Sequence, residues 1–430
     1  MSTRRVTLAA LLVLPLALAG CKINSINYFP PKAAHVRAVN VVADAPVLDI
    51  SAGDAATWSG VAFEGSTDYV DLDNASTTFS AKAPSATSPL VQGTFSLAGE
   101  QTYTLITYGT TAAPAFVLLP DATIQPGSGR SQLRVVEVAT GIGTIDVYLT
   151  TPGLAIDTLS PNFGGVDYNG ATAYLQFPSG TYQLRITGTG TKTVIYDSGS
   201  RAFSDNTSTD LIVYARTSGT LPNALLLDVN GAGQRVVANN TLANVRFMHA
   251  APQAGNINVL VDGTALFSDL AYPQPTGYST VTAATHTVTF EATATPGSPI
   301  ASVTPTFAPA SDSSIFVSGL AGSTHAVVLS DNNLPPQSGN AKFRFVNASI
   351  GVGALDVLIN NVKQVSALAP DTASGYIELA AGTYTIAFSD PATGVVRATL
   401  SGVTATDTQT NSVYAYGTAD ALAGVVVQDD

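Results

Sequence analysis

Charge is the property that this chain has least of. Only 11% of its 430 residues are Asp, Glu, Lys or Arg, whereas a soluble domain usually has about a quarter. Acidic residues outnumber basic ones, and the formal net charge is −12. Such a chain repels phosphate backbones and anionic lipid head groups, so the sequence predicts no nucleic-acid partner. Neutral polar side chains must cover the surface instead, as is typical of extracellular all-β proteins.

Cysteine and histidine are also scarce. Cys21 is the only cysteine, which excludes a disulfide within the chain, so each domain must be stabilised by its apolar core. The four histidines, His35, His249, His286 and His325, have no HxH or HExxH spacing, and we predict no metal site. Two turns rich in side-chain oxygens, at 71–76 and 330–333, fall far short of a calcium loop.

Motifs for catalysis are missing as well. The sequence has no GxSxG elbow around a nucleophilic serine, and no Walker or Rossmann glycine pattern after a strand. We therefore predict that the protein is not an enzyme and has no cofactor. One alternative stays open: a hydrolase whose carboxylates or histidines converge from distant parts of the chain.

The N-terminus predicts where the protein goes. Residues 1–20 combine a short basic start with the apolar run Val6–Ala19, and small residues precede Cys21. This layout is that of a secretory signal and is too short for a confident spanning helix. Leu18–Cys21 resembles the lipoprotein box of bacteria. The resemblance implies cleavage before Cys21, lipidation of that cysteine, a tether over 21–34, and attachment of the chain to a membrane through the lipid. An aspartate after the cysteine would resemble a signal for retention at the inner membrane, but Lys22 stands there. We therefore expect the protein in the bacterial cell envelope, at the outer membrane or cell surface where two membranes exist.

One pattern occurs four times along the chain. Its copies start with VRAVN at Val36, LRVVE at Leu133, VRFMH at Val245 and FRFVN at Phe343. Each copy has an arginine, an Asp or Asn twelve residues later, a tyrosine, and a closing strand that ends in Asp. The shared positions are Arg37, Arg134, Arg246 and Arg344; Asp49, Asp146, Asn258 and Asp356; Tyr69, Tyr174, Tyr278 and Tyr376; and Asp121, Asp228, Asp331 and Asp429. Such regular spacing indicates an internal repeat.

Each copy has the size of an independent domain and the periodicity of β-strands. Polar and apolar residues alternate in Thr181–Ile186, Thr285–Phe290 and Thr383–Phe388, and Gly, Pro and Asn separate such runs. We therefore predict an all-β fold of tandem immunoglobulin-like antiparallel β-sandwich domains. The predicted repeats are 35–122, 131–231, 243–333 and 341–430. Four such bodies in a row would reach on the order of 100 Å.

The repeated residues suggest structural roles. Arg37 and Asp49 are equidistant from Ala43, the expected turn centre. If the first two strands form a hairpin, these side chains face each other in an exposed ion pair of roughly 0.2–1 kcal/mol. The same pairing is expected in copies two and four, with a hydrogen bond between Arg246 and Asn258 in copy three.

Other repeated positions allow two interpretations. The four tyrosines are expected in the core with the hydroxyl at the sheet edge, although a ligand-stacking row is the alternative. His249 and its counterparts Asn40, Glu137 and Asn347 are expected to hydrogen-bond a turn backbone. Trp58, the only tryptophan, is a possible ligand contact if it is exposed.

The copy with the most complete pattern has Arg246, His249, Pro252 and the ending NVLVDG. This segment resembles the bacterial domain of unknown function 4397 family. The resemblance implies a secreted or surface-attached repeat protein and supplies no catalytic residue, since no activity is established for the family. The expected function is a structural, spacer or adhesive role. The alternative is a glycan-binding or envelope-polymer-binding module that uses Trp58 or the insertion at Ser160–Gly170; a protein surface partner is also possible.

Overall fold

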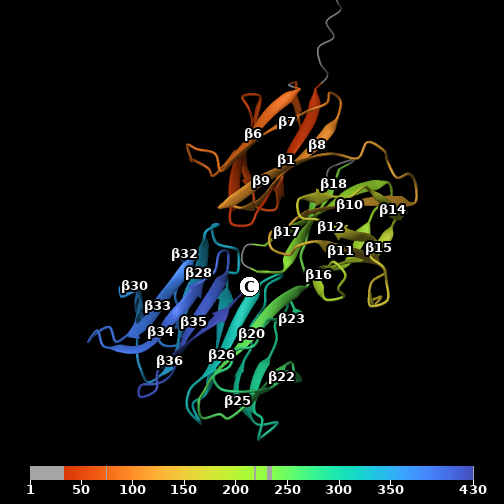
Figure 1. Cartoon of the computed structure of the whole chain (residues 1–430). Coiled ribbons are helices and arrows are strands. Elements are labelled where there is room, and N and C mark those ends of the chain that lie inside the picture. The colour runs from red at the N-terminus through yellow and green to blue at the C-terminus, as the bar shows by residue number, and fades with distance from the viewer. Residues whose placement is uncertain (1–32, 74, 217–218, 230–234, 430) are drawn as a thin grey trace, which may run out of the picture.

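The chain consists of β-strands arranged in eight sheets, two for each of four domains. The structure is a computed structural model and describes residues 33–73, 75–216, 219–229 and 235–429. The all-β prediction is confirmed, since these residues contain no helix and hence none long enough to cross a membrane. The predicted signal peptide and Cys21 lie outside the described residues. Figure 1 shows the four domains in chain order from red to blue.

Domains 1 and 2 are built from the first nineteen strands. The strands of domain 1 are β1 (Ala34–Val42), β2 (Val47–Ala52), β3 (Ala56–Ala62), β4 (Gly65–Ser66), β5 (Val70–Leu72), β6 (Ser76–Lys82), β7 (Val91–Ser96), β8 (Thr102–Thr110) and β9 (Ala113–Pro120). Those of domain 2 are β10 (Arg130–Val138), β11 (Ile145–Thr150), β12 (Phe163–Val166), β13 (Gly170–Ala171), β14 (Leu175–Pro178), β15 (Gly180–Gly188), β16 (Val194–Phe203), β17 (Thr207–Ala215), β18 (Pro222–Asp228) and β19 (Arg235–Ala238).

Domains 3 and 4 repeat this arrangement. The strands of domain 3 are β20 (Leu242–Ala250), β21 (Ile257–Val261), β22 (Thr264–Leu270), β23 (Ser279–Thr282), β24 (Val288–Ala292), β25 (Pro299–Val303), β26 (Asp312–Ser318) and β27 (His325–Asp331). Those of domain 4 are β28 (Asn340–Ile350), β29 (Leu355–Ile359), β30 (Val362–Leu368), β31 (Thr372–Ala373), β32 (Ile377–Ala380), β33 (Gly382–Ser389), β34 (Val396–Ala405), β35 (Thr410–Thr418) and β36 (Ala423–Gln428).

One sheet of each domain is mixed rather than purely antiparallel, which corrects the prediction in this detail. In domain 1 the mixed sheet has the order β4-β1-β8-β9, and β1 runs parallel to β8 with Val36 opposite Tyr103. The other sheet has the order β3-β2-β6-β7 and is antiparallel. A parallel pair needs a long crossover, and here the whole second sheet forms part of that connection.

The opening stretch of each repeat is an arch between the two sheets, so the predicted hairpin is wrong. β1 and β2 belong to different sheets, and the loop from Ala43 to Pro46 crosses from one to the other. The polar position before this loop holds the arch: the Asn40 amide donates to the carbonyls of Ala45 and Val61. The predicted turn-binding role is thereby confirmed, and His249 Nε2 lies 2.7 Å from the carbonyl oxygen of Gly255 in the same way.

The hydrophobic core of each domain lies between its two sheets. In domain 1 it includes Val36, Leu48, Phe79 and Leu105. Trp58 packs into this core and is only 8% exposed. The prediction that Trp58 serves as an exposed ligand contact is therefore wrong, because its ring faces inward from β3 toward the mixed sheet.

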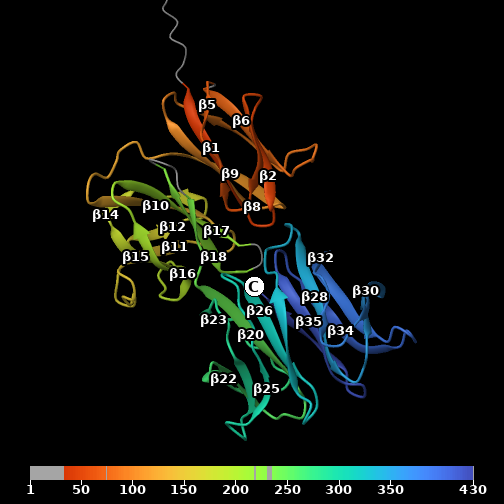
Figure 2. The same ribbon diagram turned by 180° about the vertical axis from the view of Figure 1, so that it is seen from behind.

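The four domains do not follow one another in a row. They form two back-to-back pairs, domains 1 and 2 (the first pair) and domains 3 and 4 (the second pair), as Figures 1 and 2 show from opposite sides. The mixed sheets face each other within each pair and enclose a second apolar layer. In the first pair this layer includes Val39, Ile106, Val136 and Ile212, and in the second Met248, Phe316, Val346 and Tyr414.

This pairing follows from the sequence of the central strands. Residues of β1 alternate between the two layers, since Val36 and Ala38 join the domain core while Val39 and Val41 join the layer between domains. A strand that is apolar on both faces must be covered on both faces. Pairing therefore replaces the extended row of about 100 Å that four separate bodies would give.

Candidate functional site

The repeated arginines lie between the two domains of each pair. They project from the face of each mixed sheet that points away from the core of its own domain. All four are buried, with Arg37 and Arg344 each 1% exposed. Each Nε atom donates to a side chain on the neighbouring central strand; the acceptors are Thr104, Asp210, Ser314 and Ser412. Each Nη1 atom donates to a main-chain carbonyl of the opposite domain; the acceptors are Asp228, Pro120, Gln428 and Ser330. Each arginine therefore links its own strand to the neighbouring central strand and also to the opposite domain.

The predicted pairing of these arginines with Asp49 and its counterparts is wrong. Asp49 accepts a hydrogen bond from the backbone N–H of Gly60, and Asn258 accepts one from that of Asp269. Asp146 and Asp356 bind Gly165 and Ala367 in the same way. All four donors have positive φ, and the ladder shifts register beside each acceptor. The spacing that the four repeats share thus marks a β-bulge. The bulge leaves one N–H group outside the ladder, and the side chain of the Asp or Asn accepts its hydrogen bond.

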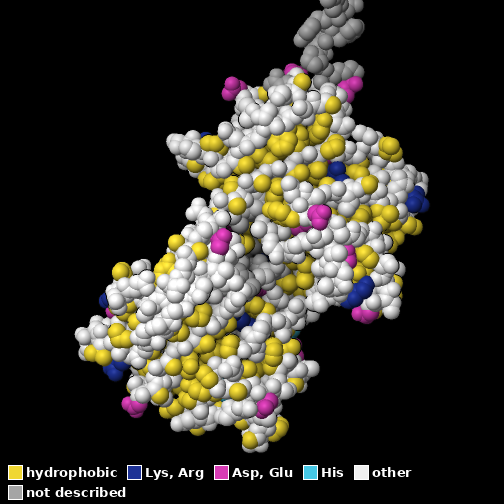
Figure 3. All heavy atoms as spheres, in the orientation of Figure 1, with side chains coloured by type: hydrophobic (Ala, Val, Ile, Leu, Met, Phe, Trp, Pro, Cys, Tyr) yellow, Lys and Arg dark blue, Asp and Glu magenta, His cyan; other side chains and the backbone are white. Residues whose placement is uncertain are grey.

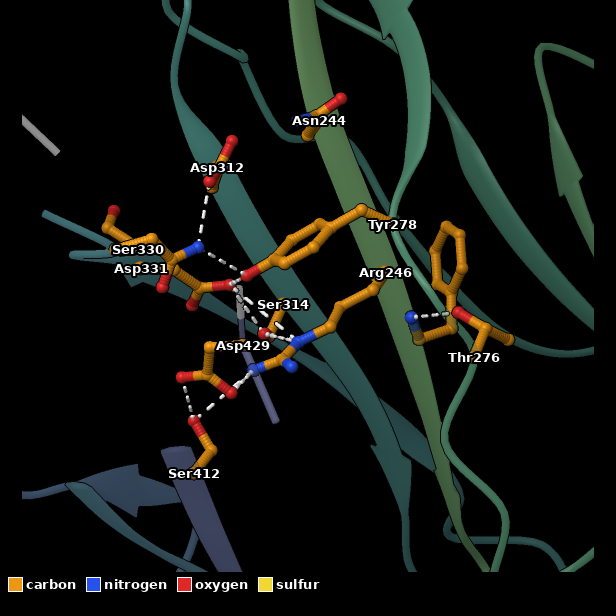
Figure 4. A network of polar contacts seen from close by, with 12 residues as sticks. Asn244, Arg246, Thr276, Tyr278, Asp312, Ser314, Ser330, Asp331, Ser412 and Asp429 are labelled. Atoms are coloured by element: carbon orange, nitrogen blue, oxygen red, sulfur yellow. Dashed lines mark hydrogen bonds and ion pairs between the residues drawn. The ribbon is translucent and has the colours of Figure 1, made fainter. Parts of the chain in front are cut away.

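The second pair contains a reciprocal ion-pair network, which Figure 4 shows around Arg246. Arg246 Nη2 of domain 3 lies 2.5 Å from Asp429 Oδ1 of domain 4. Arg344 Nη2 of domain 4 lies 2.5 Å from Asp331 Oδ1 of domain 3. Burial raises the pKa of Asp429, although Arg246 and Arg344 oppose this shift. Each domain supplies one cation and one anion to the other, and Arg246 also lies 3.9 Å from Asp331 within its own domain. The shortest contact of each arginine is therefore with the carboxylate of the partner domain.

The repeated tyrosines cover the arginines, which corrects the core interpretation. The guanidinium carbons of Arg37, Arg134 and Arg246 lie 4.8, 4.8 and 4.9 Å from the ring centroids of Tyr69, Tyr174 and Tyr278. Arg344 lies 5.3 Å from that of Tyr376. Each ring screens a buried cation from solvent, an arrangement worth about 0.5–2 kcal/mol. Tyrosine is favoured here because its hydroxyl also donates to a buried polar partner, such as Asp121 at 2.6 Å.

Domain 2 departs from this plan, and its predicted closing residue Asp228 is not the counterpart of the other three. The backbone N–H of Val229 binds Ser208, as those of Asp121 and Asp429 bind Thr102 and Thr410. Val229 therefore occupies the position of the closing aspartate. The carboxylate comes instead from Asp210 on β17, which lies 2.5 Å from Arg134 within the same domain. As a result, Nη2 of Arg37 has no hydrogen-bond partner in the described part of the chain.

Three of the four histidines have an acidic partner close by. His35, His286 and His325 each lie beside one aspartate, at 2.6, 2.7 and 3.0 Å from Asp71, Asp262 and Asp371. Across residues 33–73, 75–216, 219–229 and 235–429, no group of three or more His, Cys, Asp or Glu is placed to hold a metal ion. Sequence reasoning found the arginines and tyrosines. It missed Asp210, Ser314 and Ser412, which lie on β17, β26 and β35. The available signal was that polar and apolar residues alternate along these central strands.

Comparisons with solved structures give weak matches. The Bacillus anthracis TIE protein is 8% identical with a TM-score of 0.15, and the match covers 89% of this chain and 66% of that one. BcpA, the major pilin subunit of Bacillus cereus, is 10% identical with a TM-score of 0.14, covering 66% and 98%. A family 26 carbohydrate-binding module from Eubacterium rectale Amy13K, solved with maltoheptaose, is 13% identical with a TM-score of 0.15, covering 43% and 92%. Values this low carry no functional argument.

Family membership rests on the sequence instead. No curated protein matches the chain. The family described as "Domain of unknown function (DUF4397)" matches residues 34–148, 243–358 and 350–430, which together exceed half of the chain. The protein therefore belongs to this family, as the sequence resemblance predicted.

Proposed function

We propose that the protein is a lipid-anchored component of the bacterial cell envelope with a non-catalytic role as a structural or adhesive scaffold. One observation carries this proposal: Arg246 and Arg344 form reciprocal buried ion pairs with Asp429 and Asp331 across the second domain pair. The chain is thus built from two double sandwiches rather than four separate beads. Such blocks present a broad surface of fixed shape, which suits spacing and adhesion.

The use of the reactive residue types supports a scaffold. The buried acids and arginines hold the interfaces, and His249 holds the arch of domain 3. A general acid or base must be free to exchange a proton with a substrate, whereas these groups are committed to the fold. Charged side chains are also sparse on the face shown in Figure 3, which suits contact with neutral polymers or protein surfaces.

Attachment through Cys21 supplies the other half of the proposal. The lipoprotein box at Leu18–Cys21 and the tether that follows would place the first pair nearest the membrane. Several acyl chains on one cysteine would anchor the protein stably, where a single chain holds only marginally. Lys22 favours sorting to the outer membrane or cell surface.

The test compares the full chain with its Cys21→Ser variant in a bacterial host that is fed an alkyne-labelled fatty acid. We expect label and membrane association in the wild type, and neither in the variant. Protease added to intact cells then reports surface exposure, and retention of the cells on immobilised envelope polymer reports adhesion. Equal labelling of both proteins would contradict lipid anchoring at this residue. Release of an enzymatic product from envelope material would contradict the scaffold role.

A further inference from the structure

A cavity of about 320 Å³ lies where domains 2, 3 and 4 meet. Ile142 and Thr220 line it from domain 2, Leu334 from the linker after β27, and Gln409 from domain 4. Its volume is at the lower end of the range for small-molecule sites, and such sites occur preferentially between domains.

The two domain pairs meet closely beside the cavity. The backbone N–H of Thr220 donates to Asp312 Oδ2 at 2.9 Å, and the Asn244 amide donates to Thr220 Oγ1 at 3.1 Å. Gly219 approaches domain 3 so closely that a Cβ atom there would lie 1.9 Å from the carbonyl oxygen of Ala310. The cavity therefore lies at a defined junction between the two blocks.

The chemistry of the walls is neutral and mixed. None of the described residues that line the cavity has a charged side chain, so an anion would find no cation and a cation no carboxylate in the wall. Hydroxyl and amide groups of Thr140, Thr408 and Gln409 both donate and accept hydrogen bonds. Ile142 and Leu334 supply apolar surface. This combination suits a molecule that has hydroxyl groups around a body of C–H groups.

Two buried oxygens beside the cavity need hydrogen-bond donors. Asn333 lines the cavity and is only 3% exposed. Its Nδ2 atom donates to Asp312 Oδ2 at 2.7 Å and to the Tyr278 hydroxyl at 3.1 Å, whereas its Oδ1 atom has no partner. Asp312 Oδ1, behind it, has none either. An unmet buried acceptor costs free energy. Both oxygens lie beneath the cavity wall, so an O–H donor in the cavity would meet Asn333 Oδ1 once that amide turned toward it.

We propose that this cavity is a binding site for a small neutral saccharide, of one or two sugar units. Its hydroxyl groups would exchange hydrogen bonds with the threonine and glutamine side chains, and would donate to Asn333 Oδ1 once that amide turned toward the cavity. The C–H face of the ring would pack against Ile142 and Leu334. Because the walls come from domain 2, from the segment after β27 and from domain 4, the bound sugar ties the first pair to the second. The site is separate from the lipid anchor, so its failure would leave the scaffold proposal standing.

The test uses the full mature chain and three sugar probes, N-acetylglucosamine, maltose and trehalose. Choline and acetate serve as charged probes of similar or smaller size. Saturation-transfer NMR followed by calorimetry should detect saturable, one-to-one binding of at least one sugar and of neither ion. No binding of any sugar at tens of millimolar, or tighter binding of choline or acetate, would overturn the proposal.

Variants locate the site. Gln409→Trp fills the cavity and should weaken sugar binding at least tenfold, while Gln364→Trp, on the exposed edge strand β30, should leave it unchanged. Gln409→Ala is a milder second variant in case the tryptophan disturbs folding, and should weaken binding severalfold. Binding that is unchanged in both Gln409 variants would overturn the assignment. Small-angle scattering with saturating sugar should show a smaller radius of gyration for the wild type and no change for Gln409→Trp.

Discussion

The two domain pairs share one interface design but distribute its charges differently. In the second pair the two shortest ion pairs cross between domains, from Arg246 to Asp429 and from Arg344 to Asp331, while a longer one of 3.9 Å joins Arg246 to Asp331 within domain 3. In the first pair the ion pair of Arg134 with Asp210 lies within domain 2, and Arg37 reaches domain 1 and domain 2 acceptors that are uncharged. The same geometry can thus be held by mutual charge compensation or by hydrogen bonds to carbonyls.

This difference teaches which part of the interface is essential. The Nη1-to-carbonyl bonds occur in all four repeats at 2.8–3.1 Å, and so does a tyrosine ring over each guanidinium. The crossing carboxylate occurs in only one pair. We infer that the carbonyl bonds and the apolar layer define the pairing, and that the crossing carboxylates make two domains depend on each other.

The largest expected effect is the loss of a crossing carboxylate. Asp331→Ala leaves Arg344 buried without its counter-ion, which should cost about 3–5 kcal/mol. Asp121→Ala is the matched change in the first pair and should cost less, about 1–3 kcal/mol. Asp121 accepts hydrogen bonds from Thr104 and Tyr69, and no arginine of the described residues donates one to it. Urea unfolding checks both, with circular dichroism for the whole chain and Trp58 fluorescence for the first pair. Equal losses would remove the distinction between the pairs.

A second effect depends on pH and belongs to the first pair. Burial raises the pKa of Glu137 to about 9, although the N–H of Ala139 opposes the shift, and an unfolded Glu titrates near 4.3. Between these values the folded state holds one more proton than the unfolded state. The free energy of unfolding therefore falls as pH rises, by up to about 1.4 kcal/mol per pH unit. Below the unfolded value this loss is absent.

Glu137→Gln replaces the titrating carboxyl group with a neutral amide, so the folded state no longer has to bind a proton. It should stabilise domain 2 by about 1–3 kcal/mol at pH 8, and by little at pH 4.5. Urea unfolding at the two pH values gives the difference directly. The Asn40 position of domain 1 provides the control, since Asn40→Gln has no titrating group and its effect should not change with pH. A gain at pH 8 no larger than at pH 4.5 would show that Glu137 ionises normally.

A third change tests whether the two pairs can be made alike. Val229→Asp places a carboxylate where the other domains have one and gives Nη2 of Arg37 a partner. We expect a gain of about 1.5–3 kcal/mol, the size of a hydrogen bond to a charged group. Val229→Asn keeps the shape without the charge and should gain less. Destabilisation by Val229→Asp beyond that of Val229→Ala would mean that the first pair tolerates no further anion.

The smallest effect concerns the bulges, which both pairs share. Asp49→Ala removes the acceptor for the N–H of Gly60 and should cost about 1 kcal/mol. Asn258→Ala should cost the same in the second pair, because the bulge geometry is common to all repeats. Thermal unfolding measures both. A loss of several kcal/mol for Asp49→Ala alone would indicate that Asp49 also supports the pairing of domains 1 and 2.

Much of the fold was predictable because strand periodicity and repeat spacing are local signals. Alternation in segments such as Thr383–Phe388 identified strands, and spacing identified four repeats. The partners of the arginines were not predictable, since Arg37 and Asp49 are close in sequence but lie on opposite sheets. A symmetrical spacing predicts a hairpin only when both strands enter one sheet. The apolar residues on both faces of β1 were the available indication that they do not.

The same reasoning explains the errors over Trp58 and Asp228. Exposure of a tryptophan near a turn depends on which sheet its strand joins, and β3 places Trp58 over the core. A one-residue offset at the end of β18 puts Val229 at the interface position. Sequence cannot settle such an offset, because Asp and Val both fit the end of a strand.

The interface of the second pair is self-complementary: each sandwich carries both an arginine and the carboxylate that receives the arginine of its neighbour. Two copies of such a module, placed face to face, satisfy the arginine and the carboxylate of both. A single further sandwich of this kind would expose an apolar sheet and an arginine that lacks its partner domain. It would pair with the same sheet of another molecule. The architecture therefore favours growth by duplication of whole pairs, because a duplicated pair brings its own cover for both mixed sheets.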